Sequence, residues 1–281
     1  MQPENVKISS VPYGNNISCG RYAQTDDAKI YYEVYGEGKP VFVLHGGGVG
    51  FAYEMGQFID KLRGDFQVVS VSTRGHGRSE IGNTPMTFEQ KANDIVTVMR
   101  EITKQPAILI GFSDGAFTAY KIASMYPESV ERVVAVGAGT LRKGFFHGEL
   151  PLSELEKADK IFIGQQKKIR PEPERWQEFL NKYMSFWENM EVGAELLSTI
   201  KAPVLLIAGD EDDHAPLITM VEAHQIIPNS RLLIVPKAWH DAFHENFNLV
   251  WEAVRPFVYS DVKNLTPSNK VNYNNKFTYT E

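Results

Sequence analysis

The sequence predicts an α/β protein with a mostly parallel, doubly wound sheet. Short apolar runs rich in Val, Ile and Leu alternate with segments of helical periodicity, and glycine-bearing turns connect them. Runs without polar alternation are typical of strands that are covered on both faces. Strands that alternate with helices form parallel sheets through right-handed crossovers. The expected strands are 28–36, 40–46, 66–72, 107–112, 132–138, 203–209 and 231–236.

Helical patterns fill the intervals between these runs. One helix is indicated at residues 86–103, where Thr87 and Gln90 have the spacing of a capping box. Residues 141–200 break the alternation, because they contain no strong strand and carry aromatic residues at spacings that suit a helix face. We interpret this region as a helical cap inserted into the core. Its aromatic residues include Trp176, Phe179, Tyr183, Phe186 and Trp187.

The chain is expected to have three parts. The core comprises residues 1–140 and 201–260, the cap comprises residues 141–200, and a polar extension comprises residues 261–281. The 281 residues are 43% hydrophobic and 23% charged, which is a globular composition with enough apolar material for a large core. The extension is rich in Asn, Lys, Ser and Thr without a clear period, so we expect it to be loosely ordered.

Charge and composition argue against several function classes. The formal net charge of -6 disfavours nucleic-acid binding, which normally needs a basic face. No apolar run approaches the ~20 residues of a membrane span, and the N-terminus lacks the basic-then-apolar order of a signal peptide. We therefore expect a cytoplasmic protein without a membrane span, although a trimmed export signal would leave the same sequence. Cys19 is the single cysteine, so no internal disulfide can form.

A serine lies between two glycines where an expected strand meets a helix. Gly111, Ser113 and Gly115 form the pattern G-x-S-x-G, with Phe112 and Asp114 at the variable positions. Such a tight bend forces the serine into an uncommon conformation and exposes its Oγ, and a Cβ at either glycine would collide with the neighbouring strand or helix. The dipole of the following helix favours negative charge that develops near the serine. The motif alone is common in glycine-rich turns, so it indicates a nucleophile only if a base and an acid elsewhere in the chain accompany it.

Partners of the right chemistry follow two later strands. A serine hydroxyl needs an adjacent base that is itself oriented by a carboxylate. Residues 210–213, all acidic, follow the expected strand 203–209. His240 follows the expected strand 231–236. Functional groups of a doubly wound sheet gather beyond the carboxyl ends of the strands, and the chain order Ser, Asp, His is that of one particular scaffold.

These features resemble the α/β-hydrolase fold over about residues 28–258. The elbow has the form Gly-(Trp/Phe)-Ser-Asp-Gly, which is similar to that of valacyclovir hydrolase-like esterases. The resemblance implies a serine hydrolase that acts through an acyl-enzyme and needs no cofactor and no metal. Its four motifs are His45-Gly46-Gly47-Gly48, the segment Thr73 to Ser79, the elbow at Ser113, and the late Gly-Asp-x-Asp and Trp-His segments.

The same resemblance identifies the acid and the base of a triad with Ser113. The family's acid lies three residues after a glycine and four before a proline, which selects Asp212 over Asp210 and Asp213. The family's base follows a short apolar strand, which selects His240 over the nearby His244. The predicted catalytic residues are therefore Ser113, Asp212 and His240.

Other residues receive supporting roles from the resemblance. The backbone N–H groups of Gly47 and Asp114 are expected to bind the oxyanion. His45 and Arg74 are interpreted as structural supports of the loops that follow their strands. The carboxylate of Asp114 would attract amine-bearing esters, a hypothesis that Asp114→Asn would test on amino and neutral esters. The expected substrate-binding side chains are those of Asp114, Trp176, Trp187 and Trp239, with packing of the cap against the core as the alternative role of the cap tryptophans.

The expected reaction is cleavage of carboxylic esters or lactones of small to medium acids, with a small-molecule ester and water as partners. Peptidase, C–C bond hydrolase and perhydrolase activities share the triad and stay open, because the cap decides the substrate. Some members of the fold bind ligands without turning them over, and a missing triad residue would favour that class. Dehalogenases and epoxide hydrolases are disfavoured because Ser113 stands where they have an aspartate nucleophile. The sequence does not predict the oligomeric state.

Overall fold

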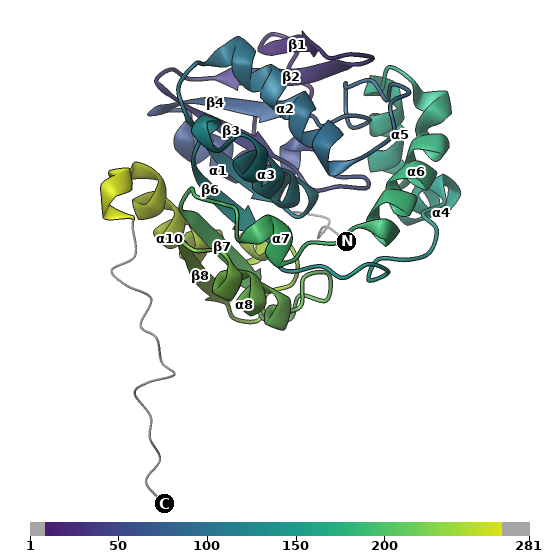
Figure 1. The fold of residues 1–281 in the computed structure, drawn as a ribbon. Helices are drawn as coiled ribbons and strands as arrows, with labels where there is room; N and C mark the ends of the chain where they lie inside the picture. The colour runs from purple at the N-terminus through teal and green to yellow at the C-terminus, as the bar shows by residue number, and fades with distance from the viewer. Residues whose placement is uncertain (1–8, 266–281) are drawn as a thin grey trace, which may run out of the picture.

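The computed structural model describes residues 9–265 and confirms an α/β fold built on one eight-stranded sheet (Figure 1). All seven expected strands are present, and most of the extension 261–281 lies outside the described residues. The strands are β1 Gly20–Gln24, β2 Lys29–Tyr35, β3 Lys39–Leu44, β4 Phe66–Val71, β5 Ala107–Phe112, β6 Val130–Val136, β7 Val204–Gly209 and β8 Ser230–Val235.

The strand order in the sheet is β1-β2-β4-β3-β5-β6-β7-β8. The pairs β1–β2 and β2–β4 are antiparallel, and every later pair in this order is parallel. The sheet is therefore mostly parallel, as predicted. Strand β1 was not predicted, because Ala23 is its only buried residue and it has no apolar run.

Helices cover both faces of the sheet. Buried residues of α2, α3 and α8 share one apolar cluster with one face, and buried residues of α1, α9 and α10 share a second cluster with the other. This is the doubly wound arrangement that continuous apolar strands require. The helices are α1 Gly56–Leu62, α2 Phe88–Ile102, α3 Asp114–Met125, α4 Leu152–Ala158, α5 Lys160–Ile169, α6 Trp176–Asn189, α7 Ala194–Leu197, α8 Leu217–Ile226, α9 Ala242–Glu245 and α10 Phe247–Tyr259.

Helix α2 begins where its capping residues predict. Thr87 is the N-cap, and its Oγ1 accepts the backbone N–H of Gln90 at 3.0 Å. The Gln90 side chain donates instead to Asp94 Oδ1 at 2.8 Å, so only one of the two bonds of a capping box forms. The Gln90 side chain turns to Asp94 because Asp94, on the same helix, belongs to a buried polar network.

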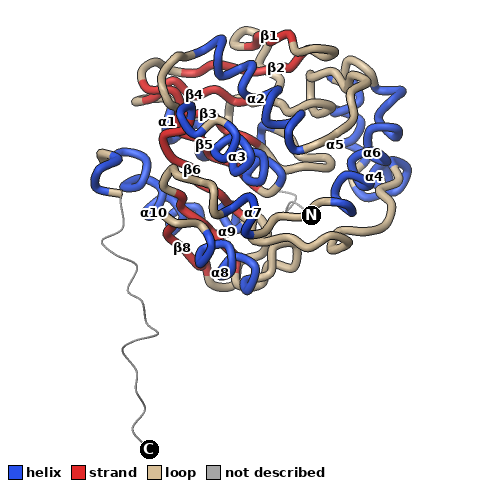
Figure 2. The backbone as a smooth tube through the Cα atoms, viewed as in Figure 1, coloured by secondary structure: helices blue, strands red, loops and turns tan. Residues whose placement is uncertain are grey.

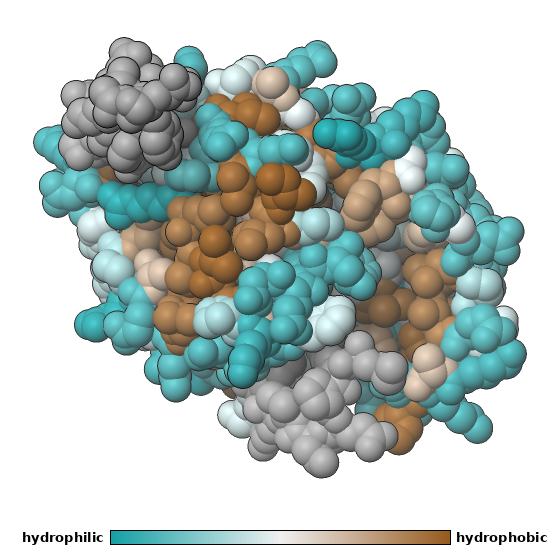
Figure 3. Space-filling model, turned by 90° about the horizontal axis from the view of Figure 1, so that it is seen from below, coloured by the Kyte–Doolittle hydropathy of each residue, from teal (hydrophilic) through white to brown (hydrophobic). Residues whose placement is uncertain are grey.

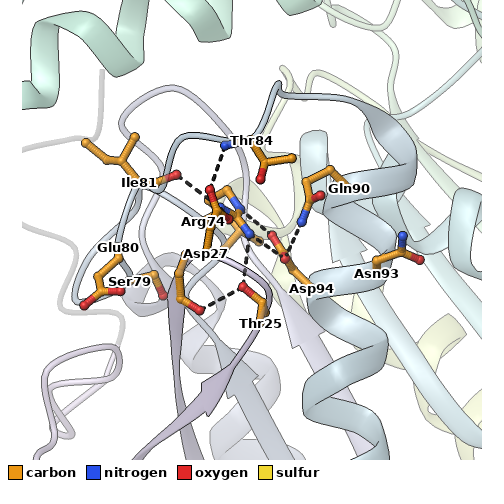
Figure 4. Close-up of polar contacts among 12 residues, drawn as sticks. Thr25, Asp27, Arg74, Ser79, Glu80, Ile81, Thr84, Gln90, Asn93 and Asp94 are labelled. Atoms are coloured by element: carbon orange, nitrogen blue, oxygen red, sulfur yellow. Dashed lines mark hydrogen bonds and ion pairs between the residues drawn. The ribbon is translucent and has the colours of Figure 1, made fainter.

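Arg74 is the centre of that network (Figure 4). Its Nε and Nη2 donate to the two carboxylate oxygens of Asp94 at 2.7 and 2.9 Å. Its Nη1 donates to Asp27 at 2.6 Å, in the turn between β1 and β2. Further bonds to Thr25 Oγ1 and the carbonyl oxygen of Ile81 use the remaining N–H groups, so all five guanidinium donors are satisfied. These contacts tie α2 to the first hairpin of the sheet.

The region between β6 and β7 is helical, as the sequence predicts. It contains α4, α5, α6 and α7, together with one isolated β-bridge between Leu141 and Val192. Helices α4, α5 and α6 form a group of their own beside the sheet, seen at the right of Figure 1 and in blue in Figure 2. Tyr183 brings α6 over the loops that follow β3 and β4.

The edge of the sheet formed by β8, together with the neighbouring α8, exposes apolar residues. Figure 3 shows apolar side chains gathered on the face seen from below, where α8 and the edge strand β8 lie. Ile218 of α8 is 64% exposed and Ile234 of β8 is 42% exposed. Within residues 9–265, no helix combines the length and the apolarity that a membrane crossing requires.

Candidate active site

Ser113 lies on a strained turn between β5 and α3. Its φ of 48° and ψ of -116° are unusual for a residue with a side chain, and its N–H donates to the carbonyl oxygen of Val136 at 2.8 Å. A Cβ at Gly111 would overlap the backbone of Gly115 and Ala116, and one at Gly115 would overlap the carbonyl oxygens at the end of β3. The two glycines therefore permit the close approach that the sequence predicts, and the turn presents the Ser113 hydroxyl.

Three predicted side chains meet at the carboxyl ends of β5, β7 and β8. Ser113 Oγ lies 2.8 Å from His240 Nε2. His240 Nδ1 lies 2.8 Å from Asp212 Oδ2. The imidazole side chain is 20% exposed, whereas the Asp212 side chain is fully buried. Since a carboxylate only accepts hydrogen bonds, Nδ1 carries the proton toward Asp212, and Nε2 of the neutral ring is left to accept the serine O–H.

Asp212 is held as a carboxylate. Burial by itself would raise the pKa of Asp212, but the hydrogen bond and charge of His240 and the N–H groups of Ala215 and His214 outweigh it, so this pKa is lowered. The two N–H groups lie 2.9 and 2.8 Å from Oδ1. Both carboxylate oxygens are thus used, one by the loop and one by the imidazole.

The rival residues have other partners. Asp210 Oδ1 accepts the N–H of Ala238 at 3.2 Å, and Asp213 pairs with His214 Nδ1 at 2.7 Å on the surface. His244 binds Asp241 at 3.0 Å and the carbonyl oxygen of Glu54 at 2.8 Å. Asp212, Asp213 and His214 lie within reach of one common ion, but the oxygens of Asp212 are already engaged by hydrogen bonds.

The loop after β3 is braced by buried polar side chains. His45 Nδ1 donates to the carbonyl oxygen of Gly46 at 2.6 Å, and its Nε2 accepts the N–H of Thr73 at 3.0 Å. Burial lowers the pKa of His45 to about 4, so the neutral ring supplies the one donor and one acceptor that these bonds need. Glu54 Oε1 accepts the N–H of Gly46 at 2.5 Å, and burial raises the pKa of Glu54 to about 7.

Gly47 and Asp114, which are expected to supply the two oxyanion donors, lie side by side in space, and Tyr183 of α6 reaches them. A Cβ at Gly47 would come within 2.9 Å of Asp114 Cβ. The same Cβ would overlap the hydroxyl of Tyr183, a residue of α6. The ring of Tyr183 also lies 6.1 Å from that of His76, in the loop after β4. Helix α6 therefore lies over the loops after β3 and β4, beside the elbow.

The three tryptophans predicted to bind substrate lie in different environments. Trp176 is fully buried, with the Arg170 guanidinium 3.8 Å from its ring centroid. Trp187 is 5% exposed and packs edge-on against Phe117 of α3 at 5.6 Å. Trp239 is 51% exposed, and its backbone N–H donates to Glu245 Oε2 at 2.8 Å. Trp176 lies inside the cap, Trp187 lies between the cap and the core, and Trp239 faces solvent beside His240.

Several residues near the elbow were not predicted to take part. Lys91 of α2 forms a buried ion pair with Asp114, so the Asp114 carboxylate does not face solvent. His214 stacks on His240 with ring centroids 4.9 Å apart and planes inclined by 26°. Glu54 supports the loop after β3. No local motif signals these contacts: Lys91 and His214 meet partners more than 20 residues away, and Glu54 reaches back eight residues to Gly46.

Comparison with known proteins identifies sequences similar to this chain. A family model described as alpha/beta hydrolase fold matches residues 39–165. The AB hydrolase superfamily protein YisY of Bacillus subtilis is 28% identical over 257 residues, covering 80% of this chain and 94% of its own. The human serine hydrolase BPHL is 24% identical over 259 residues, covering 85% of this chain and 87% of its own.

The fold has solved counterparts. A crystal structure of a serine hydrolase involved in carbazole degradation, the CarC enzyme, superimposes with a TM-score of 0.72. The match covers 85% of this chain and 98% of that one, at 19% sequence identity. At that identity the match shows a shared fold, and it confirms the predicted architecture.

Proposed function

We propose that this chain, which belongs to the α/β hydrolase superfamily, is a serine hydrolase that cleaves carboxylic esters or lactones through an acyl-enzyme. The observation that carries the proposal is the pair of 2.8 Å contacts that joins Ser113 to His240 and His240 to Asp212. These three groups are the nucleophile, the base and the orienting acid that acyl transfer requires.

The first half of the reaction forms the acyl-enzyme. Ser113 Oγ attacks the carbonyl carbon while His240 Nε2 takes its proton, and Asp212 stabilises the imidazolium that results. A bond forms between Oγ and the carbonyl carbon, and the carbonyl oxygen becomes an oxyanion. His240 then gives its proton to the leaving alkoxide as the C–O bond of the ester breaks.

The second half releases the acid. Water takes the place of the alcohol, His240 accepts one of its protons, and the resulting hydroxide attacks the acyl carbon. The proton then returns to Ser113 Oγ as the acyl bond breaks, which restores the starting state. In a lactone the leaving alkoxide stays attached to the acyl chain, so one product carries both groups.

The oxyanion is stabilised by backbone donors on both sides. One donor is the backbone N–H of Asp114, the first residue of α3, whose dipole favours negative charge at this end. The other is the backbone N–H of Gly47, in the braced loop after β3. Loss of one such donor costs about 2.7 to 4 kcal/mol of transition-state stabilisation. The bracing of Gly46 by His45 and Glu54 supports this role, because the donors act only if they are held in place.

A non-catalytic ligand-binding role is the alternative from another class. It is disfavoured by the unbroken chain of hydrogen bonds from Ser113 through His240 to Asp212, which ligand binding does not require. A fluorophosphonate probe decides between the two roles, because it reacts covalently only with an activated serine.

The test compares the full chain with Ser113→Ala and with Ser124→Ala, a serine at the other end of the same helix α3. We expect wild type and Ser124→Ala to be labelled and Ser113→Ala to stay unlabelled. Labelling of Ser113→Ala would refute the nucleophile. A panel of p-nitrophenyl esters of rising chain length, together with a lactone and a chromogenic peptide, then separates esterase and lactonase from peptidase activity.

A further inference from the structure

A buried lysine contacts the residue that follows the nucleophile. Lys91 lies in the first turn of α2, and its Nζ donates to Asp114 Oδ2. The Lys91 side chain is 7% exposed and that of Asp114 is 1% exposed. A charged pair so well removed from water is costly to bury unless its geometry is good, so its position beside Ser113 calls for a reason.

The ammonium group of Lys91 also faces two aromatic rings of the cap. Its Nζ lies 5.6 Å from the ring centroid of Tyr183 and 5.5 Å from that of Phe186, both in α6. A carboxylate combined with aromatic faces is a typical environment for binding an organic cation. Here the cation is supplied by the protein itself.

The pair lies beside Gly47, in the loop after β3. Asp114 Cβ approaches Gly47, and Tyr183 contacts both Gly47 and the ammonium of Lys91. The second carboxylate oxygen of Asp114, Oδ1, is buried and makes no hydrogen bond to the part of the chain that the structure describes. Asp114 therefore keeps an unused acceptor next to the oxyanion loop, while Lys91 cancels its charge.

We propose that Lys91 determines specificity, as an internal cation that occupies the place where a substrate ammonium group would bind to Asp114. The enzyme then favours esters whose acyl group is uncharged near the scissile carbonyl. This inference rests on the proposed esterase function and deepens it. With Lys91 present, an incoming ammonium group meets a neutralised carboxylate and a like charge, whereas without Lys91 it meets an uncompensated carboxylate and two aromatic faces.

An open space lies close to this place, on the other side of Phe186. An open hollow of about 580 Å³ lies between the 83–88 segment and α6. Phe186 lines this hollow and also contacts the Lys91 ammonium, so it separates the ion pair from solvent. Truncation of Lys91 to alanine would extend the space behind Phe186 as far as Asp114.

The test uses two esters that differ by one charge. They are the p-nitrophenyl esters of 3-methylbutanoic acid and of valine, which have the same carbon skeleton. The measured quantity is the ratio of kcat/KM for the neutral ester to kcat/KM for the amino ester, after correction for spontaneous hydrolysis. We expect a wild-type ratio of at least ten, and a wild-type ratio below one would overturn the proposal.

Variants of Lys91 test its part in that ratio. Lys91→Ala should lower the ratio at least tenfold, and Lys91→Arg, which keeps the cation, should leave it within threefold of wild type. The double variant Lys91→Ala with Asp114→Asn should lose the gain on the valine ester, because the carboxylate is gone. An unchanged ratio in Lys91→Ala would overturn the proposal.

A matched control separates this effect from loss of any charge between the same helices. Lys121 of α3 pairs with Glu89 of α2 near the surface, where the glutamate is 55% exposed. Lys121→Ala should leave the ratio unchanged. If Lys91→Ala does not fold, Lys91→Gln carries the test, since it keeps most of the volume without the charge; a shift below threefold would then count against the proposal.

Two further measurements sharpen the result. Ethylammonium added to Lys91→Ala should restore the wild-type ratio by filling the vacated place, and the larger tetraethylammonium should not; equal effects of both would count against the proposal. Fluorophosphonate labelling of Ser113 reports the nucleophile separately. Absence of labelling in wild type would end the proposed function, whereas normal labelling with equal ratios in wild type and Lys91→Ala would end only this inference.

Discussion

Two buried ion pairs start from residues three apart on α2 and end in different surroundings. Asp94 pairs with Arg74, away from Ser113, and Lys91 pairs with Asp114, the residue that follows Ser113. In the first pair, each N–H group of the Arg74 guanidinium has a partner, and the Asp94 carboxylate also accepts a hydrogen bond from Gln90. The carboxylate of the second pair has one oxygen that makes no hydrogen bond within residues 9–265.

The difference separates support from function. A fully bonded network has no capacity left for a ligand, so its value is to hold segments together, here α2 and the first hairpin. An incompletely bonded group is expensive to bury, so it needs an explanation, and for Asp114 the adjoining Ser113 offers one. The contrast therefore predicts large losses of stability from the first pair and altered activity from the second.

The largest effect is expected at Asp212, whose carboxylate orients His240 in the proposed mechanism. Asp212→Asn should lower kcat about 10,000-fold, because an amide in place of the carboxylate favours the wrong tautomer of His240. Steady-state hydrolysis of a p-nitrophenyl ester measures the loss, and circular dichroism checks the fold. A loss below about tenfold would mean that Asp210 or Asp213 is the working acid.

The next largest effect should be a loss of stability at the pair of Arg74 and Asp94, in which every N–H group has a partner. Asp94→Ala removes the bidentate partner of buried Arg74 and should cost about 3 to 5 kcal/mol of unfolding free energy, measured by urea denaturation. Activity per folded molecule should change little. Lys121→Ala, at the partly exposed pair between α2 and α3, is the control and should cost about 1 kcal/mol or less. Equal costs in the two variants would erase the contrast.

Glu54 sharpens the comparison, because a backbone N–H rather than a cation holds its carboxyl group. Burial raises its pKa from 4.5 to about 7. Between these values the unfolded chain releases the proton while the native chain keeps it, so the unfolding free energy falls as pH rises. Glu54→Gln should remove this fall, on the order of 3 kcal/mol, while an amide oxygen still accepts the N–H of Gly46.

Urea denaturation of wild type and Glu54→Gln from pH 4.5 to 8 measures that difference. Subtraction removes the groups that do not interact with Glu54, and the difference that remains belongs to Glu54 together with His244, whose pKa the charge of Glu54 helps to raise. Parallel stability curves would show that the native carboxyl group ionises at its ordinary pKa.

The smallest effect is expected at Trp239, which is about half exposed beside the base. Trp239→Ala should change the unfolding free energy by about 0.5 kcal/mol or less, as surface substitutions usually do. If its ring contacts substrate, KM for longer acyl chains should rise while KM for acetate esters stays the same. An equal KM for all chain lengths would remove Trp239 from the substrate site.

Much of the architecture was predictable from local signals. Continuous apolar runs identified seven strands, and Thr87 identified the start of α2. Edge strand β1 escaped, because a strand with one buried residue has no run to read. The roles of Asp212 and His240 stay predictions, but their meeting with Ser113 followed from the rule that loops after parallel strands share one edge of the sheet.

The amino-acid sequence by itself determined seven of the eight strands, the elbow and the order of the candidate catalytic residues, because periodicity and turn chemistry act over a few neighbouring residues. Only the tertiary structure decided that Lys91 neutralises Asp114, that Gln90 turns to Asp94, and that Tyr183 reaches Gly47. Such contacts depend on which faces of distant segments are pressed together. A lysine in a helix has the same local sequence signal whether it ends in water or against a buried carboxylate.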